Sequence, residues 1–287
     1  LTIDGEVIGA NLAKAQVSLM DVNGNSTIST SELRAYSKSA TIGAIKYDAA
    51  FSDPDSGGKL KIGGAINDLV SDSTGTIPNT GINAQDFVAM LDADFAVKGA
   101  LTYQAGNLDI AFDGPDGAGT ATTSSTGGEV AFEMGSNGMS YNVGQKNLAV
   151  SALVPDVPLP ITLIMAESKF NLAMPLRESD EEQDFAFGFA MGNFTVSDML
   201  WSMFDPATNL PRNPATFAVD LSGKAKILFD FFDPGQAAAL ESSGAAPGEL
   251  NALSLNSIVI DAVGARLTAA GGFTFDNTDL VSFNGMP

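Results

Sequence analysis

Regular alternation of apolar and polar residues is the feature that most constrains the fold of this chain. Between Phe95 and Val143 it recurs in five short runs, for example at Leu108, Ile110 and Phe112. Glycine-rich turns separate the runs about every ten residues, which is typical of an antiparallel meander. These turns lack the lysine and the strand-to-helix context of a phosphate-binding loop, so we interpret them as hairpin turns.

Later in the chain the same alternation predicts strands with strongly apolar faces. Two sets of residues carry it: Phe185, Phe187 and Phe189, and Ile227, Phe229 and Phe231. An apolar stripe at this spacing is compatible with a protein core packed under helices and also with the wall of a binding groove. We therefore predict a mainly β fold, with long antiparallel strands in a curved, groove-like or barrel-like sheet.

We expect about three short helices beside this sheet. They are predicted over Asn83–Leu91, over Ser197–Phe204 with Ser197 as N-cap, and over Pro234–Leu240 with Asp233 as N-cap. The only tryptophan, Trp201, lies in the second helix, and we expect it to be mostly buried under the sheet. We expect Ser71 to Gly81 to form a polar loop.

Composition excludes several classes of function. The 287 residues carry a net charge of −20, so phosphate repulsion argues against nucleic acid, and an anionic bilayer surface is also disfavoured. Cysteine and histidine are absent, which removes thiol chemistry, disulfides, zinc sites of these residues and histidine-based catalysis. The carboxylates are scattered, so we predict no enzyme and no cofactor. We also predict no membrane span, because the sequence has no apolar run of about 18 residues.

One segment resembles a calcium-binding loop of the EF-hand type. Its candidate ligands are Asp21, Asn23, Asn25, Thr27 and Glu32. Ser26 stands where the sharp turn of such a loop needs glycine, and the flanking residues are strand-like. The alternative, which we favour, is a polar hairpin turn built on Asn23-Gly24.

A run of acidic residues follows Arg177. It contains Glu178, Asp180, Glu181, Glu182 and Asp184. A metal cluster is conceivable, but the run is contiguous and has no ligand-like spacing, so it favours a solvated turn.

A set of residues in the middle of the chain is typical of one protein family. They are Ser197, Asp198, Trp201, Asp205, Pro206, Arg212, Asp220 and Gly223, with the Asp53-Pro54 turn and the segments from Phe273 to Asn277 and from Phe283 to Pro287. On these residues the chain resembles the domain-of-unknown-function 2125 family of alphaproteobacteria, over most of its length. The resemblance implies a periplasmic protein that lacks both termini here, and it supplies no catalytic residues.

The strand-rich pattern of that family is in turn similar to AsmA-type envelope proteins, which fold a sheet into an elongated groove that handles lipid. This similarity implies a periplasmic protein that binds or conducts lipid or another hydrophobic ligand. The alternative is a structural or interaction subunit of a cell-envelope complex. We expect a single elongated domain over residues 1–287, and a division into 1–82 and 83–287 is also compatible with the sequence.

Overall fold

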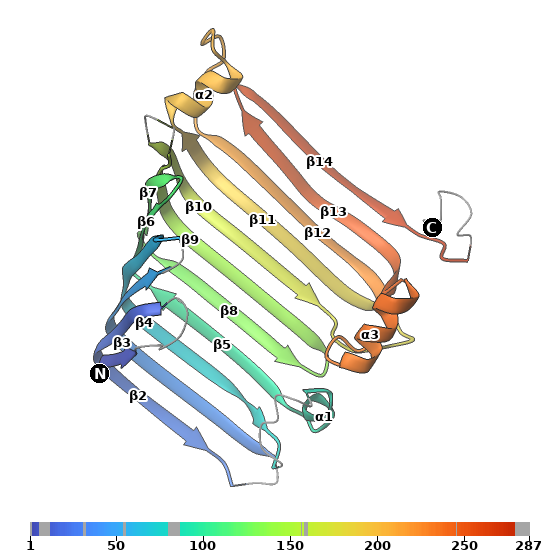
Figure 1. The fold of residues 1–287 in the computed structure, drawn as a ribbon. Coiled ribbons are helices and arrows are strands. Elements are labelled where there is room, and N and C mark those ends of the chain that lie inside the picture. Colours follow the sequence, from blue (N-terminus) through green and yellow to red (C-terminus); the bar gives the residue numbers. More distant parts are fainter. Residues whose placement is uncertain are drawn as a thin grey trace.

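The computed structural model describes residues 2–5, 12–30, 33–53, 56–79, 87–155, 157, 160–244 and 246–278. These residues form one antiparallel, 14-stranded sheet with three short helices, and the sheet is strongly curved (Figure 1). The prediction of a mainly β fold with a curved sheet and few helices is therefore confirmed.

The elements follow one another along the chain with short connections. The strands are β1 (Thr2–Gly5), β2 (Leu12–Ile28), β3 (Arg34–Ser52), β4 (Lys59–Ile77), β5 (Ala96–Tyr103), β6 (Ala105–Gly114), β7 (Gly117–Ser125), β8 (Gly128–Gly135), β9 (Gly138–Leu153), β10 (Ile161–Met174), β11 (Gln183–Val196), β12 (Ala215–Ile227), β13 (Gly248–Ala262) and β14 (Ala265–Thr274). The helices are α1 (Phe87–Asp92), α2 (Asp198–Phe204) and α3 (Pro234–Ser243).

The topology is a simple meander, although β4 and β9 each have two partners on one side. Strands β5 and β6 pair with successive halves of β4 in one register, from Ala96 opposite Thr76 to Asp113 opposite Lys59. They therefore act as one long strand that is interrupted at Gln104. Strands β7 and β8 pair with β9 in the same manner. Since β4 pairs with β5 and β6, the sheet is continuous across the alternative division near residue 82.

The sheet bends sharply along a line at right angles to the strands, which extends from β2 to β11. The cross-strand pairing is interrupted along one row of residues. This row passes through Asp21, Gly43, Asp68, Gln104, Gly127, Asn147, Ala166 and Asn193. The φ angle is positive at Asp21 (54°), Asp68 (52°), Asn147 (47°) and Asn193 (49°). Asp and Asn tolerate this left-handed conformation better than other residues with a side chain, so their placement explains where the sheet bends.

The bend divides the sheet into two parts. The minor part consists of β1, β6, β7 and residues 12–20, 44–52, 59–67, 148–153, 161–165 and 194–196, and the major part holds the remaining strand segments. Figure 1 shows the minor part almost edge-on at the left, beside β9, and the major part from its face. In each strand that crosses the bend, the side-chain alternation changes phase there. An inserted residue in a β-bulge has the same effect.

Three strands differ from the sequence-based prediction. Strand β2 continues through Asn23-Gly24, where Gly24 lies opposite Ala40, so the predicted hairpin turn at this position is wrong. Strand β4 continues to Ile77 because its polar residues still pair with β5, so residues 71–77 are no loop. Strand β12 ends at Ile227, and Phe229 and Phe231 lie in the connection to α3.

The helices lie at the ends of the strands (Figure 1). Asp233 caps α3 as predicted, since its carboxylate accepts the N–H groups of Gly235 at 2.8 Å and Gln236 at 3.2 Å. Ser197 precedes α2 but its hydroxyl makes no capping bond. Only 87–91 of the first predicted helix is described as helix, and residues 83–86 lie outside the described part.

A small core lies at one end of the sheet, around α1. Met90 is 3% exposed and Leu91 1% exposed, and Leu176, which follows β10, is 2% exposed. The ring of Phe87 contacts Phe232 of the connection before α3, with centroids 4.7 Å apart. This group, which we call the end cluster, joins three connections that are far apart in the sequence.

Candidate functional site

The apolar side chains of the major part share one face of the sheet. Directly opposed residues of antiparallel neighbours point to the same side, so each row of paired residues defines a face. One such row contains Leu101, Val130, Val143, Phe170, Phe189, Val219 and Ile258, and the next contains Phe132, Tyr141, Leu172, Phe187, Leu221 and Leu255. The predicted common face of Phe185, Phe187 and Phe189 is thereby confirmed.

The apolar face of the minor part lies on the same side of the sheet. Tyr103 belongs to the apolar face of the major part, and its hydroxyl lies 3.2 Å from the hydroxyl of Ser125 across the bend. Ser125 pairs with Gly106, on the apolar face of the minor part that also carries Leu108 and Ile110. We call this combined surface the inner face.

Aromatic rings on neighbouring strands contact one another along the inner face. The ring of Phe170 lies 6.3 Å from that of Tyr141 and 5.8 Å from that of Phe187, between centroids. Phe189 and Phe217 are 6.1 Å apart. These rings remain accessible at several points, since Phe132 is 39% exposed and Tyr141 is 38% exposed. The contacts order the rings without removing them from solvent.

On the inner face, several aromatic rings lie opposite glycines, which have no side chain to contact the ring. A Cβ atom at Gly99 would lie 2.5 Å from the ring of its cross-strand partner Phe132. At Gly223 it would lie 2.4 Å from the ring of Phe185, which is again the paired residue. The rings therefore lie over the glycines, an arrangement that compensates for the missing side chain. Gly223, one of the residues that carry the resemblance described above, thus has a packing role.

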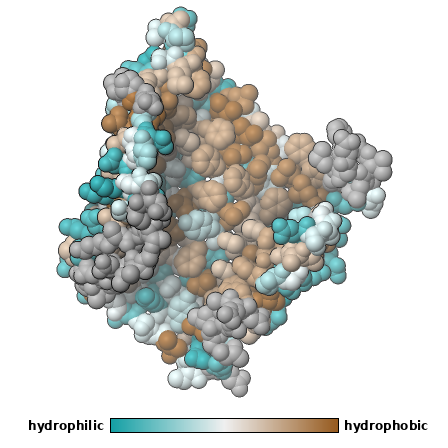
Figure 2. Space-filling model, viewed as in Figure 1, coloured by the Kyte–Doolittle hydropathy of each residue, from teal (hydrophilic) through white to brown (hydrophobic). Residues whose placement is uncertain are grey.

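No layer of the described residues covers the inner face of the major part. Figure 2 shows apolar residues gathered on this hollowed face, beside the wall that the minor part forms. Helix α2 has no buried residue, and Met203 and Phe204 are 72% and 78% exposed. Trp201 is only half-buried, so the prediction that it lies mostly buried under the sheet is wrong. The reason is that α2 extends from the end of β11, where no strand lies beneath it.

The two faces of the sheet differ in their charged residues. Acidic residues populate the opposite, outer face, where Glu133 pairs with Lys98 at 3.1 Å and Glu167 with Lys169 at 2.7 Å. On the inner face none of the described strand residues is Asp or Glu, although the chain contains 34 of them. The cations of this face among the described residues are Arg34 and Lys38.

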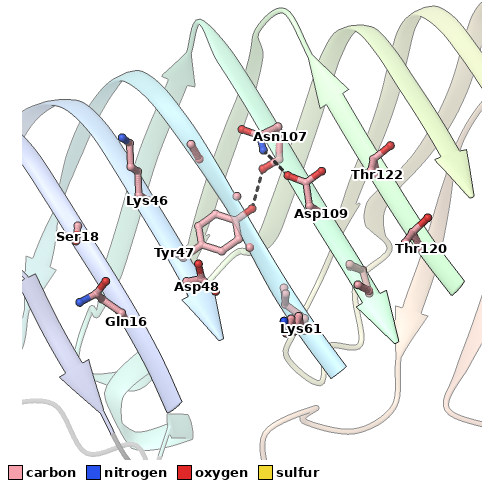
Figure 3. Close-up of a pocket in the computed structure, with 16 residues that line it drawn as sticks. Gln16, Ser18, Lys46, Tyr47, Asp48, Lys61, Asn107, Asp109, Thr120 and Thr122 are labelled. Atoms are coloured by element: carbon pink, nitrogen blue, oxygen red, sulfur yellow. Dashed lines mark hydrogen bonds between the residues drawn. The ribbon is translucent and has the colours of Figure 1, made fainter. Parts of the chain in front are cut away.

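A shallow polar cavity of about 680 Å³ lies on the outer face of the minor part (Figure 3). Lys46, Asp48, Lys61 and Asp109 are exposed at its surface. Tyr47, between Lys46 and Asp48, pairs with Gly64 on the inner face. Its hydroxyl donates a hydrogen bond to the carbonyl of Asn107 at 3.0 Å, and partial burial together with the charge of Asp109 raises the pKa of Tyr47. Its polar lining is typical of a solvated sheet surface.

The other residues that carry the resemblance fix the loop after α2 and the end of the sheet. Asp205 is 5% exposed and accepts the N–H groups of Leu210 at 2.8 Å and Asn209 at 3.0 Å, which lowers the pKa of its carboxyl group. Pro206 follows at the surface. Arg212 pairs with Asp198, and Asp220 accepts a hydrogen bond from Asn256 at 3.0 Å. These contacts are structural and bring together no reactive groups.

The calcium-loop candidates lie along a strand. Asp21, Asn23, Asn25 and Thr27 belong to β2, where Asn23 pairs with Thr41 and Thr27 with Ser37. An extended strand separates its first and last members by about 20 Å, at roughly 3.3 Å per residue, so these side chains do not converge on one ion. Glu32 lies outside the described residues.

The acidic run begins in the connection between β10 and β11, and its last member, Asp184, belongs to β11. Glu178, Asp180, Glu181, Glu182 and Asp184 are all exposed. Within the described part of the chain, no group of three or more Asp or Glu side chains is arranged to hold a metal ion. Arg177 turns away from the run and binds Asp230 at 2.7 Å and Asp92 at 2.8 Å, and these bonds raise its pKa.

Comparison with known proteins adds no relative. No family model matches the chain, and no curated protein or solved structure is significantly similar to it. Among the described residues, no helix is long and apolar enough to cross a membrane. The functional argument therefore depends on the geometry of the inner face.

Sequence reasoning missed the charged residue on the inner face. It found the Phe185 to Phe189 stripe but did not place Lys38 on the same surface. A signal was present, because the alternation changes phase between Ile66 and Leu69 in β4. Such a phase change within one long strand indicates a bend.

Proposed function

We propose that the chain is a non-enzymatic protein that binds or carries lipid, or another hydrophobic ligand, on its inner face. The observation that supports this proposal is the continuous apolar surface, whose described strand residues include no Asp or Glu although the chain carries a net charge of −20. Monomeric soluble proteins rarely leave large contiguous apolar patches exposed, so such a patch indicates a binding surface. We propose the periplasm as its location, in line with the resemblance described above.

The shape of the surface suits a long apolar chain better than a compact ligand. The rows of paired residues run across the strands from β5 to β13 without interruption by a charge. At about 4.8 Å between neighbouring strands, the six intervals from β5 to β13 extend for about 29 Å. The minor part stands beside this surface as a wall and adds a second apolar surface (Figures 1 and 2).

Lipid extraction tests the proposal. The purified protein is extracted with organic solvent and the extract is analysed by mass spectrometry, for the wild type and for Phe132→Glu. We expect a lipid in the wild-type extract and on the order of tenfold less in Phe132→Glu, because a carboxylate loses its hydration against an apolar chain.

The matched control is Ile164→Glu. Ile164 is 54% exposed and Phe132 is 39% exposed, but Ile164 lies on the outer face of the sheet. The control should retain lipid at the wild-type level, and melting curves should show that both variants fold. A wild-type extract without lipid, or equal amounts in the two variants, would reject the proposal.

A second function, as an interaction subunit of an envelope complex, is favoured by β14. All ten residues of this last described strand are exposed, and an accessible strand edge can pair with a strand of a partner. The two proposals predict different results, since an interaction subunit should purify without lipid and should associate with another envelope protein through β14.

A further inference from the structure

Among the described residues of the inner face, Lys38 is the exposed cation. It lies on β3, between its cross-strand partners Ser26 on β2 and Ser73 on β4. Ser73 in turn lies opposite Gly99 on β5. Small side chains thus flank the lysine on both neighbouring strands.

The lysine differs from the other charged groups of the sheet in its partners. Arg34, on the same face, donates hydrogen bonds to the side-chain oxygen of Asn79 at 3.2 Å and to its carbonyl at 2.9 Å. Lys98 and Lys169, on the outer face, pair with glutamates. Among the described residues, Lys38 has no acidic partner within ion-pair distance. Its charge is therefore available to a ligand on the inner face.

The row of residues that contains Lys38 leads directly onto the aromatic surface. From Lys38 the row passes Ser73 and Gly99 and then reaches Phe132, Tyr141, Leu172 and Phe187. With neighbouring strands about 4.8 Å apart, Phe132 lies about 14 Å and Phe187 about 29 Å from Lys38 across the sheet. A cationic position at one end and an apolar surface beyond it match the two parts of an amphiphile.

Building on the proposed function, we infer that the ligand is an anionic lipid whose headgroup binds at Lys38 and whose acyl chain lies across β8 to β11. Charge complementarity supports this choice. The net charge of −20 repels anions, but the inner face has no acidic residue among its described positions, and repulsion from outer charges falls off within about 8 Å at physiological salt. The headgroup would meet the exposed Lys38, beside the small polar side chains of Ser26 and Ser73, and the acyl chain would meet the apolar rows beyond them.

Titration with two lysolipids tests this inference. Lysophosphatidylglycerol is anionic and lysophosphatidylcholine is zwitterionic, and both are used with the same acyl chain at submicellar concentration. Calorimetry should show preferential binding of lysophosphatidylglycerol by the wild type. Lys38→Gln should lose about fivefold in affinity for lysophosphatidylglycerol only, in line with the usual contribution of one lysine to anionic-lipid binding. Higher salt should reduce the preference.

The matched control is Lys46→Gln. Lys46 lies on the same strand but on the outer face, and it is exposed like Lys38. This variant should bind both lysolipids as the wild type does. Glycerol phosphate alone should not bind measurably, because it lacks the acyl chain.

Several outcomes would contradict the inference. Equal affinity of the wild type for the two lysolipids, an unchanged preference in Lys38→Gln, or binding of glycerol phosphate as tightly as the lysolipid would each reject it and leave the proposed function standing. Absence of binding by both lysolipids would reject the proposed function as well.

Discussion

The end cluster and the inner face use the same kinds of apolar residue for different purposes. In the end cluster, Leu91 is 1% exposed and Leu176 is 2% exposed, because α1 and two connections close over them. On the inner face, Phe132 and Tyr141 remain more than a third exposed, because the helices lie at the strand ends. The comparison shows that apolar content alone does not define a core, since the residues need a covering layer.

The difference also separates stability from binding. Burial of an apolar side chain stabilises a fold by roughly 1.5–3 kcal/mol, whereas an exposed ring contributes through its contacts with neighbours only. We therefore expect the end cluster to contribute strongly to stability for its size. The inner face should tolerate substitution better and should change mainly in ligand binding.

The largest effect is expected for Leu91→Ala. Removal of this fully covered side chain should lower the free energy of unfolding by about 2–5 kcal/mol, because a cavity remains. The matched variant is Leu267→Ala on β14, where the leucine is 56% exposed and the loss should stay within about 0.5 kcal/mol. Urea denaturation measures both. Equal losses would remove the distinction between the two regions.

A smaller effect is expected for Arg177→Gln, at the rim of the end cluster. Its guanidinium joins Asp230, whose side chain is 13% exposed, to the exposed Asp92. Loss of the charged hydrogen bonds should cost about 1–3 kcal/mol in urea denaturation. The control is Lys98→Gln, which breaks an exposed pair on the outer face and should cost less than about 1 kcal/mol. A loss at Arg177 no larger than at Lys98 would show that the rim is not tightly packed.

The smallest effect is expected at Asp205, where hydrogen bonds rather than apolar burial order the loop after α2. Its pKa is lowered by the N–H groups of Leu210 and Asn209. The ionised carboxylate therefore stabilises the fold above the unfolded-state pKa of about 3.9, and this stabilisation is lost as pH falls through the folded-state pKa. In thermal melts the wild type should exceed Asp205→Ala near pH 6, and the difference should shrink toward pH 3. A pH-independent difference would contradict this account.

Alternation in the sequence was sufficient to predict the meander, because one face of each strand is apolar and the other polar. Local chemistry was sufficient for α3, where Asp233 and Pro234 specify the helix start. The Asn23-Gly24 turn failed, because a dipeptide that favours a hairpin turn was accommodated inside β2 by pairing with β3. The turn propensity of a dipeptide does not include its pairing with another strand.

The candidate surface could be predicted only in part. The phenylalanine stripe of β11 is visible in the sequence, but whether a layer covers it depends on where the helices pack. Trp201 illustrates this limit, since the spacing of apolar residues in α2 suggested a helix lying on the sheet. In the structure α2 extends from the end of β11, and the spacing alone gives no direction for the helix.

The most direct test of the central claim compares adjacent residues on opposite faces of β8. The chain contains no cysteine, so Phe132→Cys and Glu133→Cys each introduce a single labelling site. A fluorophore at each site is titrated with a lysolipid that carries bromine atoms in its acyl chain and quenches on contact. The account predicts strong quenching at position 132, on the inner face, and little at position 133, on the outer face. Equal quenching at the two positions, or stronger quenching at position 133, would contradict the claim that the inner face binds lipid.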